Sequence, residues 1–141
     1  MLAAEKAHLV RVLLWALMSV LTGTAVLALL AVRRSTSDLL SGFAVQIIGW
    51  GVFEATVALV ALVGLVPRDL SAAARLDQHL WFETGLDVGL IAIGVTLALT
   101  TYGWTQGRRL GGVGAGLGII VQGAVLLVFD ARFLAMVNRF V

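Results

Sequence analysis

Four long apolar runs alternate with short polar stretches along the chain. A helix needs about 20 apolar residues to cross the hydrocarbon core of a bilayer, and each run reaches that length. The polar stretches "RRSTSD" and "GWTQGRRLGG" are short enough to close two helical hairpins, and Pro67 separates the hairpins because it cannot continue a helix. Four crossings place both termini on the same side of a membrane. The predicted transmembrane helices cover about residues 9–32, 39–66, 80–102 and 113–137.

The composition supports this assignment. Hydrophobic residues make up 60% of the 141 residues and charged residues 13%, against about 25% charged in ordinary soluble domains. Such a chain cannot cover its own surface with polar side chains, so we expect lipid to solvate it. The N-terminal stretch contains an apolar segment longer than the roughly 7–15 residues of a secretory signal, and we interpret it as a retained first helix.

Charge and cysteine content exclude several classes of function. The formal net charge of +2 is too small to indicate nucleic-acid binding, and the chain has no basic tail. Cysteine is absent, which excludes disulfides, thiolate chemistry and iron–sulfur clusters. The single lysine among ten basic residues, together with the abundance of Ala, Gly, Val and Leu, is typical of a bacterial protein from a GC-rich genome.

An internal repeat emerges when the chain is shifted by 76 residues, because "GFAVQIIGWGVFEA" then aligns with "GIIVQGAVLLVFDA". The alignment pairs Glu54 with Asp130, an acid with an acid. It also pairs Gln46 with Gln122, and apolar composition alone does not explain a glutamine and an acid eight residues apart in both copies. We therefore predict two helical hairpins of the same orientation, a parallel repeat about an axis along the membrane normal. The repeats cover residues 1–66 and 76–141.

Several ionisable side chains fall inside the predicted spans. Glu83 and Asp87 lie four residues apart on one face of the third helix, where two carboxylates repel if both are ionised. Either a cation bridges them or one of them carries a proton. The repeat places Arg11 at the depth of Asp87, and we expect Arg11, with Arg132 as second choice, to pair with these acids and with Asp130. The predicted buried polar network consists of Arg11, Gln46, Glu54, Glu83, Asp87, Gln122, Asp130 and Arg132.

Two interpretations of this network are open. A charge near the bilayer centre costs at least about 2.5–3.5 kcal/mol, and ionisable residues inside membranes are commonly functional, which indicates a proton or cation site. Alternatively, the network is structural and fixes the register of the helices, as buried polar groups do in some proteins. We favour the structural interpretation because acids and arginines are nearly balanced in so small a bundle.

Small residues form stripes on the third and fourth predicted helices. On the fourth, glycines recur at intervals of four and seven residues, which return to nearly the same face at about 3.6 residues per turn. Asp130 continues this stripe. Such faces let helix backbones approach closely, and they exceed what one four-helix bundle needs, which favours self-association or an additional membrane partner. The predicted packing glycines are Gly85, Gly89, Gly112, Gly116 and Gly123.

No pattern in the sequence indicates catalysis. His8 and His79 are the only histidines, and a haem would need facing ligands within the bundle. No Ser–His–Asp constellation or set of four metal ligands is visible, and no strand precedes the glycines of "GGVGAGLG", as a dinucleotide-binding motif requires. We therefore predict no catalytic residue, no metal, no cofactor and no enzymatic activity.

The segments "WFETGLDVGLIAIGVTLA" and "GAGLGIIVQGAVLLVFDARF" resemble an uncharacterised family of small four-helix bacterial membrane proteins, a domain of unknown function. The resemblance covers about the last 60 residues well and the first half loosely, with Glu83 at a position where that pattern favours a polar amide. It implies a four-span architecture and marks Asp87, Gln122 and Asp130 as family-type positions. It implies no activity.

We expect a non-enzymatic structural or accessory subunit of a larger membrane complex, with other membrane subunits or further copies of itself as partners besides the lipid bilayer. The alternative is a minimal proton- or cation-coupled carrier or channel that uses Glu54, Asp87 and Asp130. The expected location is the bacterial inner (cytoplasmic) membrane. Six basic residues lie on the terminal side and four on the other, but burial of Arg11 and Arg132 would leave four on each. The positive-inside rule then gives little preference, and we place the termini in the cytoplasm.

Overall fold

The computed structural model describes residues 2–66, 70–105 and 110–138, which form four helices and no strand. The prediction of an all-α chain with four helices is confirmed over these residues. Pro67, which we expected to separate the two hairpins, lies outside the described residues. The helices are α1 (Leu2–Val32), α2 (Asp38–Val63), α3 (Leu70–Thr105) and α4 (Gly111–Val137).

Two helices begin earlier than the apolar runs predict. α1 begins at Leu2 rather than near residue 9, and α3 begins at Leu70 rather than near residue 80. The preceding segments "AAEKAH" and "AAARLDQH" are polar enough to fall outside an apolar window. They nevertheless consist mainly of good helix formers and contain neither glycine nor proline, so the helices continue through them.

The loop between α1 and α2 is fixed by local backbone and side-chain bonds. Arg34 follows the last turn of α1 with a φ of 49°, and this left-handed turn lets the Ser35 N–H donate to the Leu30 carbonyl at 3.1 Å. Ser37 then caps α2, because its hydroxyl accepts a hydrogen bond from the Leu40 N–H at 3.4 Å. The first hairpin is therefore closed by residues 33–37, close to the predicted turn.

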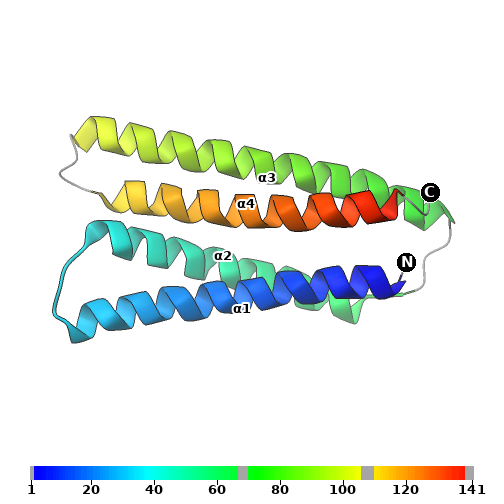
Figure 1. Cartoon of the computed structure of the whole chain (residues 1–141), viewed down its shortest axis with the longest axis horizontal. Helices are drawn as coiled ribbons and strands as arrows, with labels where there is room; N and C mark the ends of the chain where they lie inside the picture. Colours follow the sequence, from blue (N-terminus) through cyan, green and yellow to red (C-terminus); the bar gives the residue numbers. More distant parts are fainter. Residues whose placement is uncertain (1, 67–69, 106–109, 139–141) are drawn as a thin grey trace.

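Figure 1 shows the α1–α2 and α3–α4 hairpins lying side by side, with both termini at the same end of the molecule. α2 packs against α4 and joins the hairpins, and α1 also contacts α4. Within the described ranges, α3 packs against α4 alone. The bundle is therefore open between α2 and α3.

Glycines allow α3 and α4 to approach closely. A Cβ atom added to Gly116 would lie 2.5 Å from the carbonyl oxygen of Gly94, and one added to Gly123 would lie 2.9 Å from that of Asp87. Gly112 also faces α3. A larger residue at these positions would have to push the helices apart. The glycine stripe of α4 thus lies in its seam with α3.

The other predicted packing glycines lie elsewhere. A Cβ atom added to Gly85 or Gly89 would meet nothing within 4 Å among the described residues, so these two glycines do not pack against another helix of the described chain. Gly85 is nine residues before Gly94, which places it about 180° around α3. Because α3 has α4 as its packing partner, that far face is exposed.

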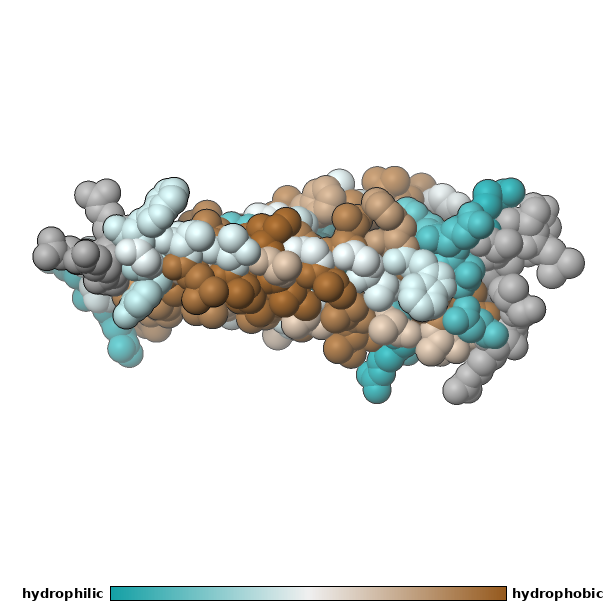
Figure 2. Space-filling view, turned by 90° about the horizontal axis from the view of Figure 1, so that it is seen from above, coloured by the Kyte–Doolittle hydropathy of each residue, from teal (hydrophilic) through white to brown (hydrophobic). Residues whose placement is uncertain are grey.

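Much of the outer surface is apolar. Large side chains such as Leu21, Val60 and Leu99 are more than 60% exposed, and Figure 2 shows an apolar band with hydrophilic residues gathered toward both ends of the molecule. All four helices are long and apolar enough to cross a membrane. The buried apolar cluster, near the terminal end, consists of Leu76, Leu80, Phe133, Leu134 and Val137.

Candidate functional site

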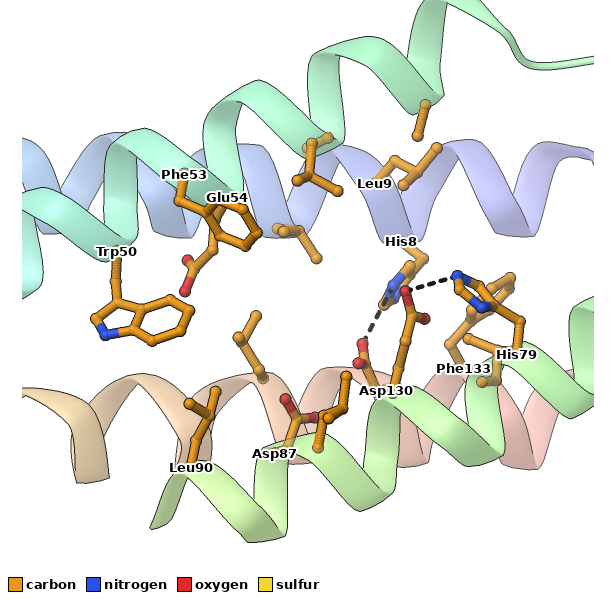
Figure 3. A pocket seen from close by; sticks show the side chains of 18 of the residues that line it. His8, Leu9, Trp50, Phe53, Glu54, His79, Asp87, Leu90, Asp130 and Phe133 are labelled. Carbon is orange, nitrogen blue, oxygen red and sulfur yellow. Dashed lines mark ion pairs between the residues drawn. The ribbon is translucent and has the colours of Figure 1, made fainter. Parts of the chain in front are cut away.

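An acidic crevice lies where the bundle is open, between α2 and α3. Its volume is about 1050 Å³, and all four helices contribute to its walls. Figure 3 shows polar side chains of α2 on one side of the crevice and of α3 and α4 on the other. The crevice exists because α3 packs against α4 and, in the described ranges, makes no helix contact with α2.

Glu54 is the acid that α2 places in the crevice. It belongs to the buried stripe of this helix, Ala44, Ile47, Gly51, Glu54 and Ala58, which recurs every three or four residues. Glu54 is 4% exposed, and neither of its carboxylate oxygens has a hydrogen-bond partner among the described residues. Figure 3 shows it pointing into the crevice next to Trp50 and Phe53. An acid at an otherwise apolar position of the stripe is thus brought to the crevice wall by ordinary helix packing.

Asp87 and Asp130 meet at the seam of α3 and α4. Asp87 is seven residues before Gly94, and Asp130 is seven residues after Gly123, so each acid continues the close-packed face of its own helix. Both are buried, and the two carboxyl groups lie close enough to influence each other's charge. Two carboxylates this close repel each other if both are ionised. The second oxygen of Asp87, Oδ2, has no partner among the described residues.

His8 of α1 is the basic group that meets these acids. Its Nε2 lies 3.3 Å from Oδ1 of Asp130, and its ring stacks on Phe133 with the centroids 4.5 Å apart. His8 is buried, and its Nδ1 has no partner among the described residues. The sequence contained a signal for it, because Glu5, His8 and Ser19 stand out as polar residues on the buried face of an apolar helix.

The expectation that Arg11 and Arg132 pair with the buried acids is corrected by the structure. Arg11 and Arg132 are exposed, and neither forms an ion pair with an acid of the crevice in the described part of the chain. Arg132 is two residues after Asp130, about 200° around α4, so it cannot share the buried face. Arg11 is rotated away from the stripe of α1 that buries His8 and Ala16. Because of their angular positions on α1 and α4, both arginines lie outside the predicted network.

Glu83 lies at the edge of the crevice rather than in its interior. Its Oε1 is 3.1 Å from Nε2 of His79, one turn earlier on α3, and the side chains are 36% and 63% exposed respectively. Glu83 and Asp87 share a face of α3, as the spacing predicted, but differ in surroundings. Asp87 is buried against α4, whereas Glu83 is partly exposed and has its own histidine.

Gln122 forms a separate polar contact between three helices. It is fully buried, its Oε1 accepts a hydrogen bond from the indole N–H of Trp15, and its Nε2 donates to the Ile47 carbonyl at 3.4 Å. Gln46, its counterpart in the proposed repeat, is half-buried and packs its aliphatic part against Gly118. The two glutamines therefore have different environments.

Within the described residues, no group of three or more His, Asp and Glu side chains is arranged to hold a metal ion. The structure thus brings together Glu54, Asp87, Asp130 and His8 and places Glu83 at their edge. It leaves Arg11 and Arg132 outside and uses Gln122 to tie helices together.

Comparisons with known proteins identify the family of this chain but give no activity for it. No curated protein and no solved structure matches the chain significantly. Residues 11–131 match DUF6992, which is described as a family of unknown function. The matched range contains every acid of the crevice except Glu5, and it excludes His8. This range covers most of the chain, so the protein belongs to the DUF6992 family of unknown function, in agreement with the resemblance of its third and fourth helices.

Proposed function

We propose that this protein is a multi-pass protein of a bacterial cytoplasmic membrane with cytoplasmic termini. The support is the length and apolar character of all four helices together with the apolar band on the outer surface. Because Arg11 and Arg132 are exposed, they count again as basic residues of the terminal side. Six basic residues on that side against four on the other then favour cytoplasmic termini. The hairpin duplication remains part of this proposal, supported by the burial of both Glu54 and Asp130.

Within such a membrane, the crevice is best suited to a small proton- or cation-coupled carrier. The observation that carries this proposal is Glu54, a buried acid whose two oxygens have no partner in the part of the chain that the structure describes. Ionisable side chains at membrane depth are costly and are usually satisfied by a partner, a proton or a transported ion. Glu54 faces a crevice whose other wall holds Asp87 and Asp130. A proton or cation entering the crevice meets several carboxyl groups on different helices.

The test is an ion-flux measurement on purified protein in liposomes, with a pH-sensitive dye inside and a potassium-diffusion potential as driving force. We expect proton or cation flux above that of empty liposomes, lost in Glu54→Gln and retained in Asp38→Asn. Asp38 is the matched control because it is an exposed acid in the first turn of the same helix. Flux equal to that of empty liposomes, or flux that Glu54→Gln leaves intact, contradicts the carrier.

A structural or accessory role is the second candidate, and the exposed face of α3 favours it. Gly85 is exposed and has open space above it, and Trp81 and Phe82 nearby are more than half exposed. A small residue on an apolar helix face permits close approach of another transmembrane helix. If this face mediates self-association, Gly85→Leu should shift the oligomer to monomer in mild detergent, measured by light scattering. Gly103→Leu, at another open glycine of α3, should not.

A further inference from the structure

We propose that the crevice between α2 and α3 binds a lipophilic organic cation, an ammonium or phosphonium group carried on an apolar body. This proposal rests on the carrier proposed above and names the class of its substrate. The three features that support it are the charge of the crevice, the aromatic side chains beside Glu54, and its size and apolar walls.

The crevice is strongly biased toward acidic groups. Among the described residues that line it, five carry carboxyl groups, two are histidines, and none is lysine or arginine. His8 and His79 each lie beside one acid, Asp130 and Glu83 respectively. Within residues 2–66, 70–105 and 110–138, Glu54 has no such neighbour at hydrogen-bonding distance. Among the described lining residues, a positive charge entering the crevice therefore meets the carboxyl group of Glu54 without competition from a lysine or an arginine.

Aromatic side chains stand directly beside that carboxylate. Trp50 and Phe53 precede Glu54 on α2, line the same crevice, and pack edge to face with ring centroids 5.8 Å apart. Figure 3 shows both rings next to the Glu54 side chain. Aromatic faces attract organic ammonium groups through their negative π surfaces, and cages of aromatic residues recognise such cations in other proteins. Trp50, Phe53 and Glu54 supply the two kinds of contact that such a cation needs.

Size and wall chemistry distinguish an organic from an inorganic cation. Inorganic cations such as Ca²⁺ and Mg²⁺ require several oxygen ligands within about 2.0–2.6 Å of one point, and the described residues contain no such group of acids and histidines. The volume of about 1050 Å³ is instead that of a pocket for a drug-sized molecule. Its walls include Val57, Ala61, Leu90, Ile93 and Leu126, which suit an apolar body.

His8 provides an observation independent of the acids. It is buried, lines the crevice, and leaves Nδ1 without a partner in the described ranges. With Nε2 directed to Asp130, this nitrogen can accept or donate a hydrogen bond to a polar group of a bound molecule. The crevice therefore offers a bound molecule a hydrogen-bonding group in addition to its negative charge.

The test is equilibrium binding of tetraphenylphosphonium to the purified full-length protein in detergent. Tetraphenylborate is the matched control because it has the same shape and the opposite charge. We expect saturable binding of the cation and none of the anion. Glu54→Gln should weaken binding at least tenfold, Trp50→Leu several-fold, and Asp38→Asn should leave it unchanged.

Glu54→Asp keeps the charge and guards against a folding artefact, since it should bind within a few-fold of the wild type. Equal binding of the cation and the anion overturns the proposal, and so does binding that Glu54→Gln leaves unchanged. If tetraphenylphosphonium does not bind but Glu54-dependent proton flux is measured, the proposed substrate class is wrong and the proposed carrier function is retained. If the cation binds at Glu54 and no flux is found, the proposed binding site is retained and the proposed carrier function is wrong.

Discussion

Nε2 of His8 on α1 lies 3.3 Å from Oδ1 of Asp130 on α4, and this pair connects the first helix to the last. Both side chains are largely buried, so most of their contact is shielded from bulk water. The stacking of His8 on Phe133 holds the imidazole in place. The basic partner of the acid is thus a histidine near the start of the chain and not an arginine.

The first prediction concerns this pair. His8→Leu and Asp130→Leu should each lower the free energy of unfolding by about 1–3 kcal/mol, because each strands a buried polar partner. The double variant should cost clearly less than the sum, since groups in direct contact are coupled. Unfolding by denaturing detergent in mixed micelles measures all three. Arg11→Gln is the control and should change stability by less than about 0.5 kcal/mol, because Arg11 is exposed. Additive costs for His8 and Asp130, or coupling of Arg11 to Asp130, would reject the pairing.

The second prediction concerns the buried glutamine. Gln122→Leu should lower the free energy of unfolding by about 1–3 kcal/mol, because it leaves the Trp15 indole N–H unsatisfied and removes the bond to the Ile47 carbonyl. Gln46→Leu is the matched control from the other hairpin. Gln46 is half-buried and contacts Gly118 through carbon atoms, so the change should cost little. If Gln122→Leu and Gln46→Leu lower the free energy of unfolding equally in the same micelle assay, the contact between Gln122 and Trp15 does not contribute to stability.

The helices themselves were predictable because an apolar run of membrane length has few alternatives to a helix. The starts of α1 and α3 were not, because the apolar window ignores the helix propensity of polar segments such as residues 70–79. The burial of Glu54 and Asp130 follows from helical phase, since each falls on a stripe of small or apolar residues. The same phase argument, applied to Arg11 and Arg132, would have excluded them from the network.

The crevice could not be predicted from the sequence. Its existence depends on α3 packing against α4 and not against α2, and the apolar patterns of these helices do not specify which neighbours meet. The proposed repeat would suggest equivalent contacts for both hairpins. Yet α1 reaches α4, whereas α3 does not reach α2 within the described residues. That difference between the hairpins opens the crevice beside Glu54.

The third prediction concerns the seam between α3 and α4. Gly116→Val should lower the free energy of unfolding by about 1–3 kcal/mol or more, because an added Cβ would lie 2.5 Å from the Gly94 carbonyl oxygen and force the backbones apart. Gly103→Val, at an open glycine of α3 outside this seam, is the control and should be tolerated. Both are measured by thermal unfolding in the same detergent. A tolerated Gly116→Val would show that the helices are not in close contact at this point.

The last prediction concerns the pH dependence of cation binding at the crevice. The titratable groups that line it are Glu5 and His8 on α1, Glu54 on α2, His79, Glu83 and Asp87 on α3, and Asp130 on α4. Protonation neutralises a carboxylate and makes a histidine positive, so each of these groups becomes less attractive to a cation as the pH falls. Lowering the pH therefore weakens the attraction of a cation to every one of these groups.

We expect the affinity for tetraphenylphosphonium to fall as the pH is lowered, by up to roughly tenfold per pH unit where one proton competes with the cation. Equilibrium binding across a pH series on one protein preparation measures the slope, with circular dichroism at each pH to confirm that the helices persist. Glu54→Gln should reduce the slope as well as the affinity, because the competing proton no longer has its principal acceptor. Asp38→Asn, which removes an exposed acid of the same helix, should leave the slope unchanged. Binding that is flat with pH, or that strengthens at low pH, would show that the cation does not depend on the carboxylates of the crevice.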